Sequence, residues 1–389
     1  MNAAEPIATD LPPLRIGGRS LLPIVQGGMG VGISAHRLAG AVARLNAVGT
    51  IASVDLRRHH PDLMAATGTA RDKAAIERAN RVALDREIRA ALAAAGGRGL
   101  IAVNVMRAVG QYADYVRQSC ESGAHAIVAG AGLPLDLPEL AAAFPAVALV
   151  PILSDARGVG IVLKKWQRRN RLPDAIVIEH PRHAGGHLGA ARIEDLADPR
   201  FEFARVLEET FALLARLGLE RERIPLVVAG GIASPEAVRA AFALGVAAVQ
   251  VGTPFAVTLE GDAHPEFKRV LAEARPEDIV EFTSVAGLPA RAVRTPWLAR
   301  YLERLPALQA QARARRECLL AWDCLEVCGL RDGLVKAGQF CIDNQLARAL
   351  AGDVEHGLFF RGAGALPFGR EIRPVRELVA HLLGAPAAA

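Results

Sequence analysis

Eight short aliphatic runs alternate with helical stretches over about the first 270 residues, and this alternation limits the possible folds more than any other feature. Most of the runs are apolar almost without interruption, as expected for strands of a parallel sheet that is covered on both faces. Eight units of strand and helix predict an α/β protein whose sheet closes into a (β/α)8 TIM barrel, with an open doubly wound sheet as the alternative. The runs span residues 23–26, 49–54, 100–105, 126–129, 147–153, 175–179, 225–229 and 247–251.

Two segments do not fit a minimal barrel. Residues 61–97 follow the second run and are long, charged and helical in pattern, so we expect a helical insertion there. Residues 276–389 follow the eighth unit, and we expect them to form a smaller helical cap domain with helices near 296–305 and 309–322. The barrel itself then occupies residues 1–275.

Capping residues mark the starts of several of the predicted helices. Ser34 precedes the first helical stretch, and Ser234 is followed by Pro235 at the first position of another helix. Both serines are therefore predicted to accept hydrogen bonds from the first turn of their helix.

Composition and charge exclude several classes of protein. The net charge is +5, but basic and acidic residues are interspersed, and the one dense basic run, residues 164–171, is typical of a solvated helix end. An anionic partner for that run is the alternative, although no nucleic-acid motif accompanies it. No apolar run reaches the ~18 residues that a membrane span needs, and the first residues lack the pattern of a secretory signal. Five cysteines without a regular spacing favour a reducing, cytoplasmic setting.

Glycine-containing loops follow the seventh and eighth runs. Gly230 and Gly231 end the seventh run, and Gly252 with Thr253 ends the eighth. In (β/α)8 barrels these two loops commonly bind a phosphate through backbone N–H groups, and glycine lets the backbone approach the phosphate oxygens closely. Tight turns without a ligand are the alternative, but two such loops at consecutive strand ends favour a phosphate site.

The motifs that follow the strands occur in a fixed order over residues 20–260. They read QGGMGVGIS (26–34), AVNVM with Asn104, PDAIVIEHPRHAGGHLG (173–189), VVAGGIAS (227–234) and VQVGTPF (249–255). In order and spacing this set resembles the nitronate monooxygenases, and AGGH followed by AGGI and GT-F is its specific part. The segment GLFFRGAGALPFG (357–369) resembles the tail that returns towards the flavin in this family and its enoyl-reductase relatives.

The resemblance implies an FMN-dependent oxidoreductase in which residues 1–275 bind the cofactor and residues 276–389 form a lid over the substrate. Gly28 and Met29 would place backbone beside the isoalloxazine ring, and Asn104 would hydrogen-bond the flavin or its ribityl chain. The phosphate would lie at the two glycine loops. The implied cofactor-binding residues are Gly28, Met29, Asn104, Glu179, Gly185, Gly186, Gly230, Gly231, Gly252 and Thr253.

The chain departs from the family in two of these motifs. Gly27, Gly28 and Met29 stand where members often have Ala-Pro-Met. His183 stands directly before Ala184, where members often have G-x-E-A-G-G-H. These two departures affect the expectation for the substrate more than the expectation for the cofactor.

Three histidines fall in the stretch EHPRHAGGHLG, residues 179–189. Their spacing would suit a metal site on a helix, but the stretch follows a strand and contains a proline and two glycines, so we expect no metal there. His187 is the predicted catalytic residue, because an imidazole beside a flavin can bind or move a proton near neutral pH. A hydrogen-bonded loop histidine is the alternative for His187, and His180 and His183 are predicted to be structural.

Four of the five cysteines lie in the predicted cap, at Cys318, Cys324, Cys328 and Cys341. Thiolates at close spacing admit a zinc or iron–sulfur site. The spacing contains no C-x2-C pair, and thiols four residues apart on a helix can simply be buried as small apolar groups. Both interpretations stay open.

The resemblance implies oxidation of alkyl nitronates, or of nitroalkanes, by dioxygen to a carbonyl compound and nitrite. An NAD(P)H:quinone reductase and an FMN-type enoyl-thioester reductase are the alternatives among flavin barrels, and a non-catalytic flavin-binding accessory protein is a further one. The expected partners are a small-molecule substrate and dioxygen, without nucleic acid or membrane, and the resemblance leaves room for a homodimer.

Overall fold

A closed barrel of eight parallel strands forms the centre of the computed structural model, which describes residues 6–315 and 317–385. The strand order is β10-β11-β3-β4-β5-β6-β7-β8, so the predicted TIM barrel is confirmed and the open sheet is excluded. Each of the eight runs forms one strand. The strands are β3 (Ile24–Gln26), β4 (Val48–Ala52), β5 (Leu100–Met106), β6 (Ala126–Gly130), β7 (Ala148–Leu153), β8 (Ile176–Glu179), β10 (Leu226–Ala229) and β11 (Ala248–Val251).

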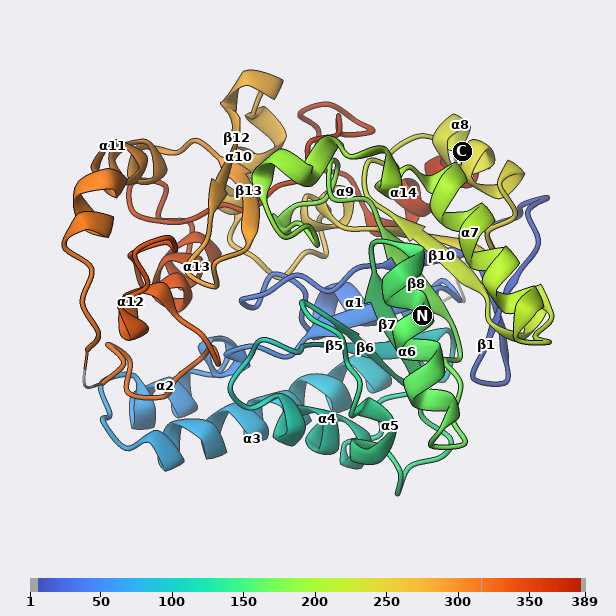
Figure 1. Cartoon of the computed structure of the whole chain (residues 1–389), viewed down its shortest axis with the longest axis horizontal. Helices are drawn as coiled ribbons and strands as arrows, with labels where there is room; N and C mark the ends of the chain where they lie inside the picture. Colours follow the sequence, from blue (N-terminus) through green and yellow to red (C-terminus); the bar gives the residue numbers. More distant parts are fainter. Residues whose placement is uncertain (1–5, 316, 386–389) are drawn as a thin grey trace.

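Helices surround the barrel (Figure 1). The charged stretch 61–97 forms α2 (Pro61–Thr67) and α3 (Lys73–Ala95), and α3 packs against α1 and α4 as part of this outer ring. The other helices around the barrel are α1 (His36–Arg44), α4 (Tyr112–Glu121), α5 (Leu137–Leu140), α6 (Ala156–Gln167), α7 (Phe203–Arg216), α8 (Pro235–Ala243), α9 (Thr253–Ala256) and α10 (Pro265–Glu273). Short 3-10 helices are η1 (Leu56–His59), η2 (Ile193–Ala197), η3 (Pro199–Phe201), η4 (Arg221–Arg223) and η5 (Pro276–Asp278).

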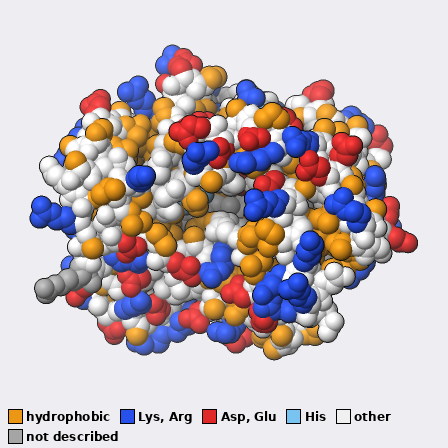
Figure 2. Space-filling view, viewed as in Figure 1, with side chains coloured by type: hydrophobic (Ala, Val, Ile, Leu, Met, Phe, Trp, Pro, Cys, Tyr) orange, Lys and Arg blue, Asp and Glu red, His pale blue; other side chains and the backbone are white. Residues whose placement is uncertain are grey.

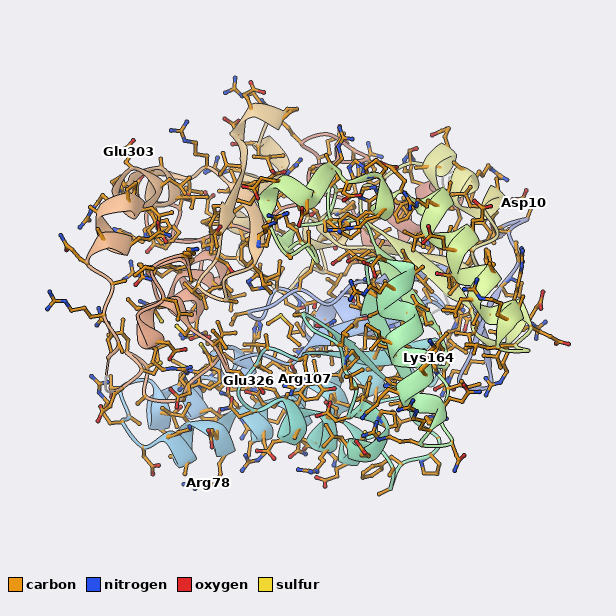
Figure 3. The ribbon with its side chains drawn as sticks, in the orientation of Figure 1. Asp10, Arg78, Arg107, Lys164, Glu303 and Glu326 are labelled. Atoms are coloured by element: carbon orange, nitrogen blue, oxygen red, sulfur yellow. The ribbon has the colours of Figure 1, made fainter. Side chains whose placement is uncertain are left out.

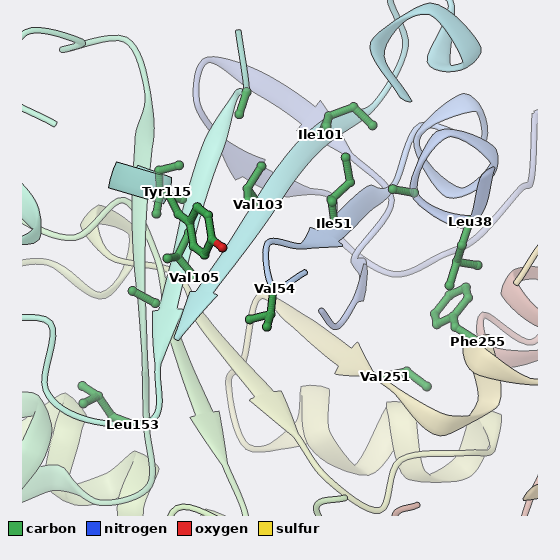
Figure 4. Packing of buried hydrophobic residues seen from close by; sticks show 14 of the residues in the cluster. Leu38, Ile51, Val54, Ile101, Val103, Val105, Tyr115, Leu153, Val251 and Phe255 are labelled. Carbon is green, nitrogen blue, oxygen red and sulfur yellow. The ribbon is translucent and has the colours of Figure 1, made fainter. Parts of the chain in front are cut away.

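The aliphatic core has two parts. Between the strands and the helices, buried side chains such as Leu38, Ile51 and Val103 form the larger cluster (Figure 4). Inside the barrel, a second cluster contains Leu14 and Leu21 of the hairpin β1 (Leu14–Ile16) and β2 (Arg19–Leu21). The hairpin thus adds its apolar side chains to the barrel interior, and the sequence pattern had not indicated it.

The C-terminal segment contains an antiparallel hairpin as well as helices. β12 (Ile279–Thr283) and β13 (Pro289–Val293) precede α11 (Pro296–Ala310), so the segment predicted as a helical cap also contains a hairpin that was not predicted. The helix predicted over 309–322 is wrong, because α11 ends at Ala310 and residues 311–315 and 317–322 form turns and irregular structure. The remaining helices are α12 (Gly329–Asp332), α13 (Ile342–Leu350) and α14 (Val375–Leu382).

The segment after α11 packs against the barrel beside the end of β5. Glu326 donates its backbone N–H to the carbonyl of Ala108 over 2.9 Å, and its carboxylate pairs with Nη1 of Arg107 at 2.6 Å (Figure 3). Gly110 donates to the carbonyl of Cys324 over 3.2 Å. In Figure 1, α11, α12 and α13 lie together on one side of the barrel, away from α7 and α8.

The outer surface carries charges of both signs. Acidic and basic side chains are interspersed on the face drawn in Figure 2. Among the helices that the structure describes, none is long and apolar enough to cross a bilayer.

The N-terminus of α1 is capped from a distant part of the chain. Ser34 does not cap α1 as predicted, because its hydroxyl accepts a hydrogen bond from the N–H of Met29 at 2.9 Å. Asp262 instead accepts from the N–H groups of Ala35 and Leu38, at 2.8 and 3.1 Å, and from that of Arg37 at 3.1 Å. The Asp262 carboxylate thus connects the segment between α9 and α10 to the start of α1. Ser234 caps α8 as predicted.

Replacing Asp262 by Ala is expected to lower the free energy of unfolding by about 1–2 kcal/mol, because three N–H groups at the start of α1 lose their acceptor. Urea denaturation followed by circular dichroism measures this change. As a control, Arg239→Ala removes only the exposed ion pair with Asp10 and should change stability by less than about 1 kcal/mol. Equal effects of the two substitutions would contradict the capping role of Asp262.

Candidate functional site

A cavity of about 640 Å³ opens at the carboxyl ends of the barrel strands. This size suits a cofactor or small-molecule site, and this end of a (β/α)8 barrel is where active sites form. All eleven residues predicted for the site line this one cavity, although their individual roles stay predictions. They are Gly28, Met29, Asn104, Glu179, Gly185, Gly186, His187, Gly230, Gly231, Gly252 and Thr253.

The glycine loops present bare backbone at one part of the cavity wall. Gly230 and Gly231 have φ angles of 105° and 77°, which side-chain-bearing residues rarely adopt. A Cβ on Gly231 would lie 3.0 Å from Cγ of His183. Close by, Oγ1 of Thr253 accepts a hydrogen bond from the N–H of Gly362 at 3.0 Å, which leaves the hydroxyl hydrogen of Thr253 free to be donated.

The loop after the first barrel strand approaches Asn104 closely. A Cβ on Gly28 would lie 2.3 Å from Cβ of Asn104, so only glycine fits at this position. The absence of a side chain at Gly28 therefore lets the Asn104 amide lie against the backbone of this loop at the cavity wall.

The AGGH motif forms a short strand, β9 (Gly186–His187), that pairs with the C-terminal hairpin. His187 lies opposite Ala290 of β13 in an antiparallel register. On the other side of the motif runs the C-terminal tail, so close that a Cβ on Gly185 would lie 2.6 Å from the backbone nitrogen of Gly362. The motif is held between β13 and this tail segment.

His187 is half-buried and borders the cavity. Its Nε2 lies 2.9 Å from Oγ of Ser284, and its ring centroid lies 5.9 Å from that of Phe360. The Ser284 hydroxyl oxygen also accepts a hydrogen bond from the N–H of Ala286 at 3.2 Å, which fixes its place. Burial lowers the pKa of His187 to about 4, so the imidazole is neutral at pH 7 and has a lone pair that can take a proton.

Glu179 ends β8 at the same cavity. Burial raises the pKa of its carboxyl to about 7. Near neutral pH this group therefore exists in both the acid and the carboxylate form, and it can hold or release a proton. The cavity thus contains a neutral imidazole and a carboxyl group that titrates near pH 7.

The other two histidines of the motif do not join His187. Nδ1 of His180 accepts a hydrogen bond from the N–H of Arg182 at 3.2 Å, and the ring centroids of His180 and His183 lie 4.7 Å apart. Only His183 borders the cavity.

The cysteines give no support for a metal centre. Cys318, Cys324, Cys328 and Cys341 are free, and burial raises the pKa of Cys341 to about 12, so this thiol is protonated at neutral pH. In residues 6–315 and 317–385, no three His, Cys, Asp or Glu side chains are arranged to hold a metal ion.

Two residues that contact or line the site were missed by reasoning from the sequence. Ser284 orients His187, and Arg361 lies buried in the tail. The signal for Ser284 was present, because two short β-type segments flank Gly287 and predict a hairpin. Nothing in the sequence indicated that Arg361 would be buried.

The barrel, with its glycine loops and a histidine at the carboxyl ends of the strands, defines a ligand-binding enzyme of the TIM-barrel class. Residues 19–384 match the family described as nitronate monooxygenase, and the chain belongs to this family. The predicted family is therefore confirmed.

Individual relatives are more distant. The chain is 34% identical over 118 residues to the nitronate monooxygenase of Pseudomonas aeruginosa, and 28% identical over 123 residues to a probable nitronate monooxygenase of Bacillus subtilis. The first alignment covers 30% of this chain and 31% of the relative, and the second covers 32% and 33%. The alignments thus span about a third of each relative's length.

Solved structures share the fold over nearly the whole chain. FabK from Thermotoga maritima gives a TM-score of 0.63 at 23% identity and covers 93% of this chain and 91% of its own. The nitroalkane oxidase from Streptomyces ansochromogenes gives 0.61 at 20% identity and covers 93% and 96%. At these identities the likeness concerns the fold alone.

Replacing Glu179 by Gln is expected to change how stability depends on pH. The folded-state pKa of about 7 lies above the ordinary carboxyl value of 4.5, so the folded protein holds this proton more tightly than the unfolded chain. The contribution of Glu179 to stability is fully present below pH 4.5 and is lost as the pH rises through about 7.

Chemical denaturation of the cofactor-free protein at about pH 5 and pH 8 measures this difference. The wild type should lose more free energy of unfolding between the two conditions than the Glu179→Gln variant does. Equal losses would contradict the raised pKa.

Proposed function

We propose that this chain is an FMN-dependent enzyme that oxidises alkyl nitronates with dioxygen to a carbonyl compound and nitrite. The observation that carries the proposal is the position of His187. Its neutral imidazole borders the same cavity as the bare glycine backbone of the two loops that commonly bind a phosphate in such barrels. Family membership supports the same reaction.

The residues at the cavity fit FMN. Gly230, Gly231 and Gly252 expose backbone where a phosphate would lie, and Thr253 has a hydroxyl hydrogen to donate. The cavity wall also contains Asn104 of β5 and, in the loop after β3, Gly28 and Met29. These three residues would contact the ring and the ribityl chain. When bound, FMN would take electrons from the substrate and pass them to dioxygen.

His187 and Glu179 provide the proton chemistry. A neutral imidazole hydrogen-bonded to Ser284 can accept the proton of a neutral nitroalkane or donate a hydrogen bond to the oxygen of a nitronate. Glu179, whose pKa lies near 7, can hold a proton in the same cavity. Residues 276–389 contribute Ser284 and Phe360 to this site, which supports their predicted role as the substrate lid.

A nitronate and dioxygen are thus the reaction partners in this proposal, and the cytoplasm is its setting, since free thiols suit a reducing compartment. A homodimer stays a prediction. Sedimentation equilibrium of the purified protein would test it.

Anaerobic stopped-flow absorbance tests the proposed reaction. The FMN-loaded protein is mixed separately with a short alkyl nitronate, with NADH and with NADPH. Rapid loss of the flavin absorbance with the nitronate, and none with either pyridine nucleotide, is the expected result. Rapid loss with NADH or NADPH alone would overturn the proposal in favour of a quinone or enoyl-thioester reductase, and no loss with any of them would favour an accessory protein.

Replacing His187 by Asn is expected to lower kcat by about 10²–10⁴-fold, the range for loss of a general acid–base group, while FMN stays bound. Steady-state oxygen uptake measures turnover, and the flavin absorbance spectrum measures cofactor content. His356→Asn is the matched control, because His356 is exposed and pairs with Asp353 away from the cavity. Unchanged kinetics in His187→Asn would remove His187 from the mechanism.

A further inference from the structure

Arg361 is a buried cation whose hydrogen bonds in the described structure include no carboxylate. The residue is only 4% exposed. Its Nε donates to the carbonyl of Leu271 at 2.9 Å, and its Nη1 donates to those of Gly362 and Gly364 at 2.9 and 3.3 Å. Burial lowers the pKa of this guanidinium, and no neighbouring acid offsets the effect. A guanidinium stays charged at neutral pH, so this buried charge lacks a counter-charge.

Arg361 is one of the residues that line the large cavity. A guanidinium has five N–H donors, and the three bonds to carbonyls leave the two donors on Nη2 for another acceptor. A buried cation is stabilised when an anion with good hydrogen-bond geometry joins it. An anion that binds in the cavity would lie next to Arg361.

The backbone next to Arg361 connects it to the two glycine loops. Gly362 donates its N–H to Oγ1 of Thr253 at 3.0 Å. A Cβ on Gly364 would lie 3.6 Å from Cα of Gly231. The tail segment therefore lies directly against both loops, with the guanidinium hydrogen-bonded to the carbonyls of this same segment.

We propose that Arg361 binds the phosphate monoester of the flavin nucleotide and makes the cavity selective for FMN over riboflavin. This inference rests on the proposed function, because it takes the cofactor to be a flavin. The glycine loops supply neutral N–H donors, and Arg361 supplies the positive charge that a phosphate of about −1.5 to −2 charge requires.

Fluorescence titration of the cofactor-free protein with FMN and with riboflavin tests the inference. Arg361→Gln removes the charge and keeps two amide N–H donors, and Arg361→Lys keeps the charge without the planar fork. Arg373→Gln is the matched control, because Arg373 is exposed and pairs with Glu371 in the same C-terminal region. Thermal denaturation of each cofactor-free variant checks that it is folded.

In the wild type and in Arg373→Gln, FMN should bind more tightly than riboflavin. Arg361→Gln should reduce this preference on the order of 10- to 100-fold, with the Kd of riboflavin nearly unchanged, and Arg361→Lys should reduce it less. An unchanged preference in Arg361→Gln, or equal binding of the two flavins by the wild type, would overturn this inference while leaving flavin binding intact. Failure of the wild type to bind either flavin would overturn the proposed function as well.

Discussion

The pairing of two-residue strand β9 with β13 is the interaction on which the site depends. The chain leaves the barrel after β8, and glycines at positions 185 and 186 let it pass between β13 and the C-terminal tail. This pairing fixes His187 opposite Ala290 and within 2.9 Å of Ser284. A histidine on a free loop would sample many orientations, whereas this one lies on a strand that is paired with β13 and borders the cavity. The residues beyond 275 thus help to position His187, the predicted catalytic residue.

Burial shifts the pKa values of three charged or titratable residues at the cavity. Desolvation keeps His187 neutral, raises the pKa of Glu179 to about 7 and lowers the pKa of the Arg361 guanidinium. All three effects disfavour charge, so the protein alone carries an electrostatic cost at this end of the barrel. A ligand with an anionic end and an uncharged, hydrogen-bonding body would relieve that cost. FMN has this distribution of charge, which is the physical basis for placing its phosphate at the arginine end.

The local sequence was sufficient to predict the barrel, and together with the family resemblance it indicated eleven residues that line one cavity. Apolar runs and glycine loops are short-range signals, and barrel closure brings all eight strand ends to one place. Contacts between segments far apart in the sequence could not be predicted from local sequence patterns. Asp262 caps α1 in place of Ser34, and the buried Arg361 donates a hydrogen bond to the carbonyl of Leu271. The residues adjacent to Asp262 and Arg361 in the sequence do not indicate either contact. The hairpin β12–β13 had a local signal, but its pairing with β9 depends on how the C-terminal segment folds back.

A crystal structure of the flavin-loaded protein tests the account most directly. It should show FMN in the barrel cavity with its phosphate against Gly230, Gly231 and the Arg361 guanidinium, and its ring system beside His187. The β9–β13 pairing should be retained, because the site requires no rearrangement of the backbone. A flavin bound in the opposite orientation, or with its ring remote from His187, would contradict the account.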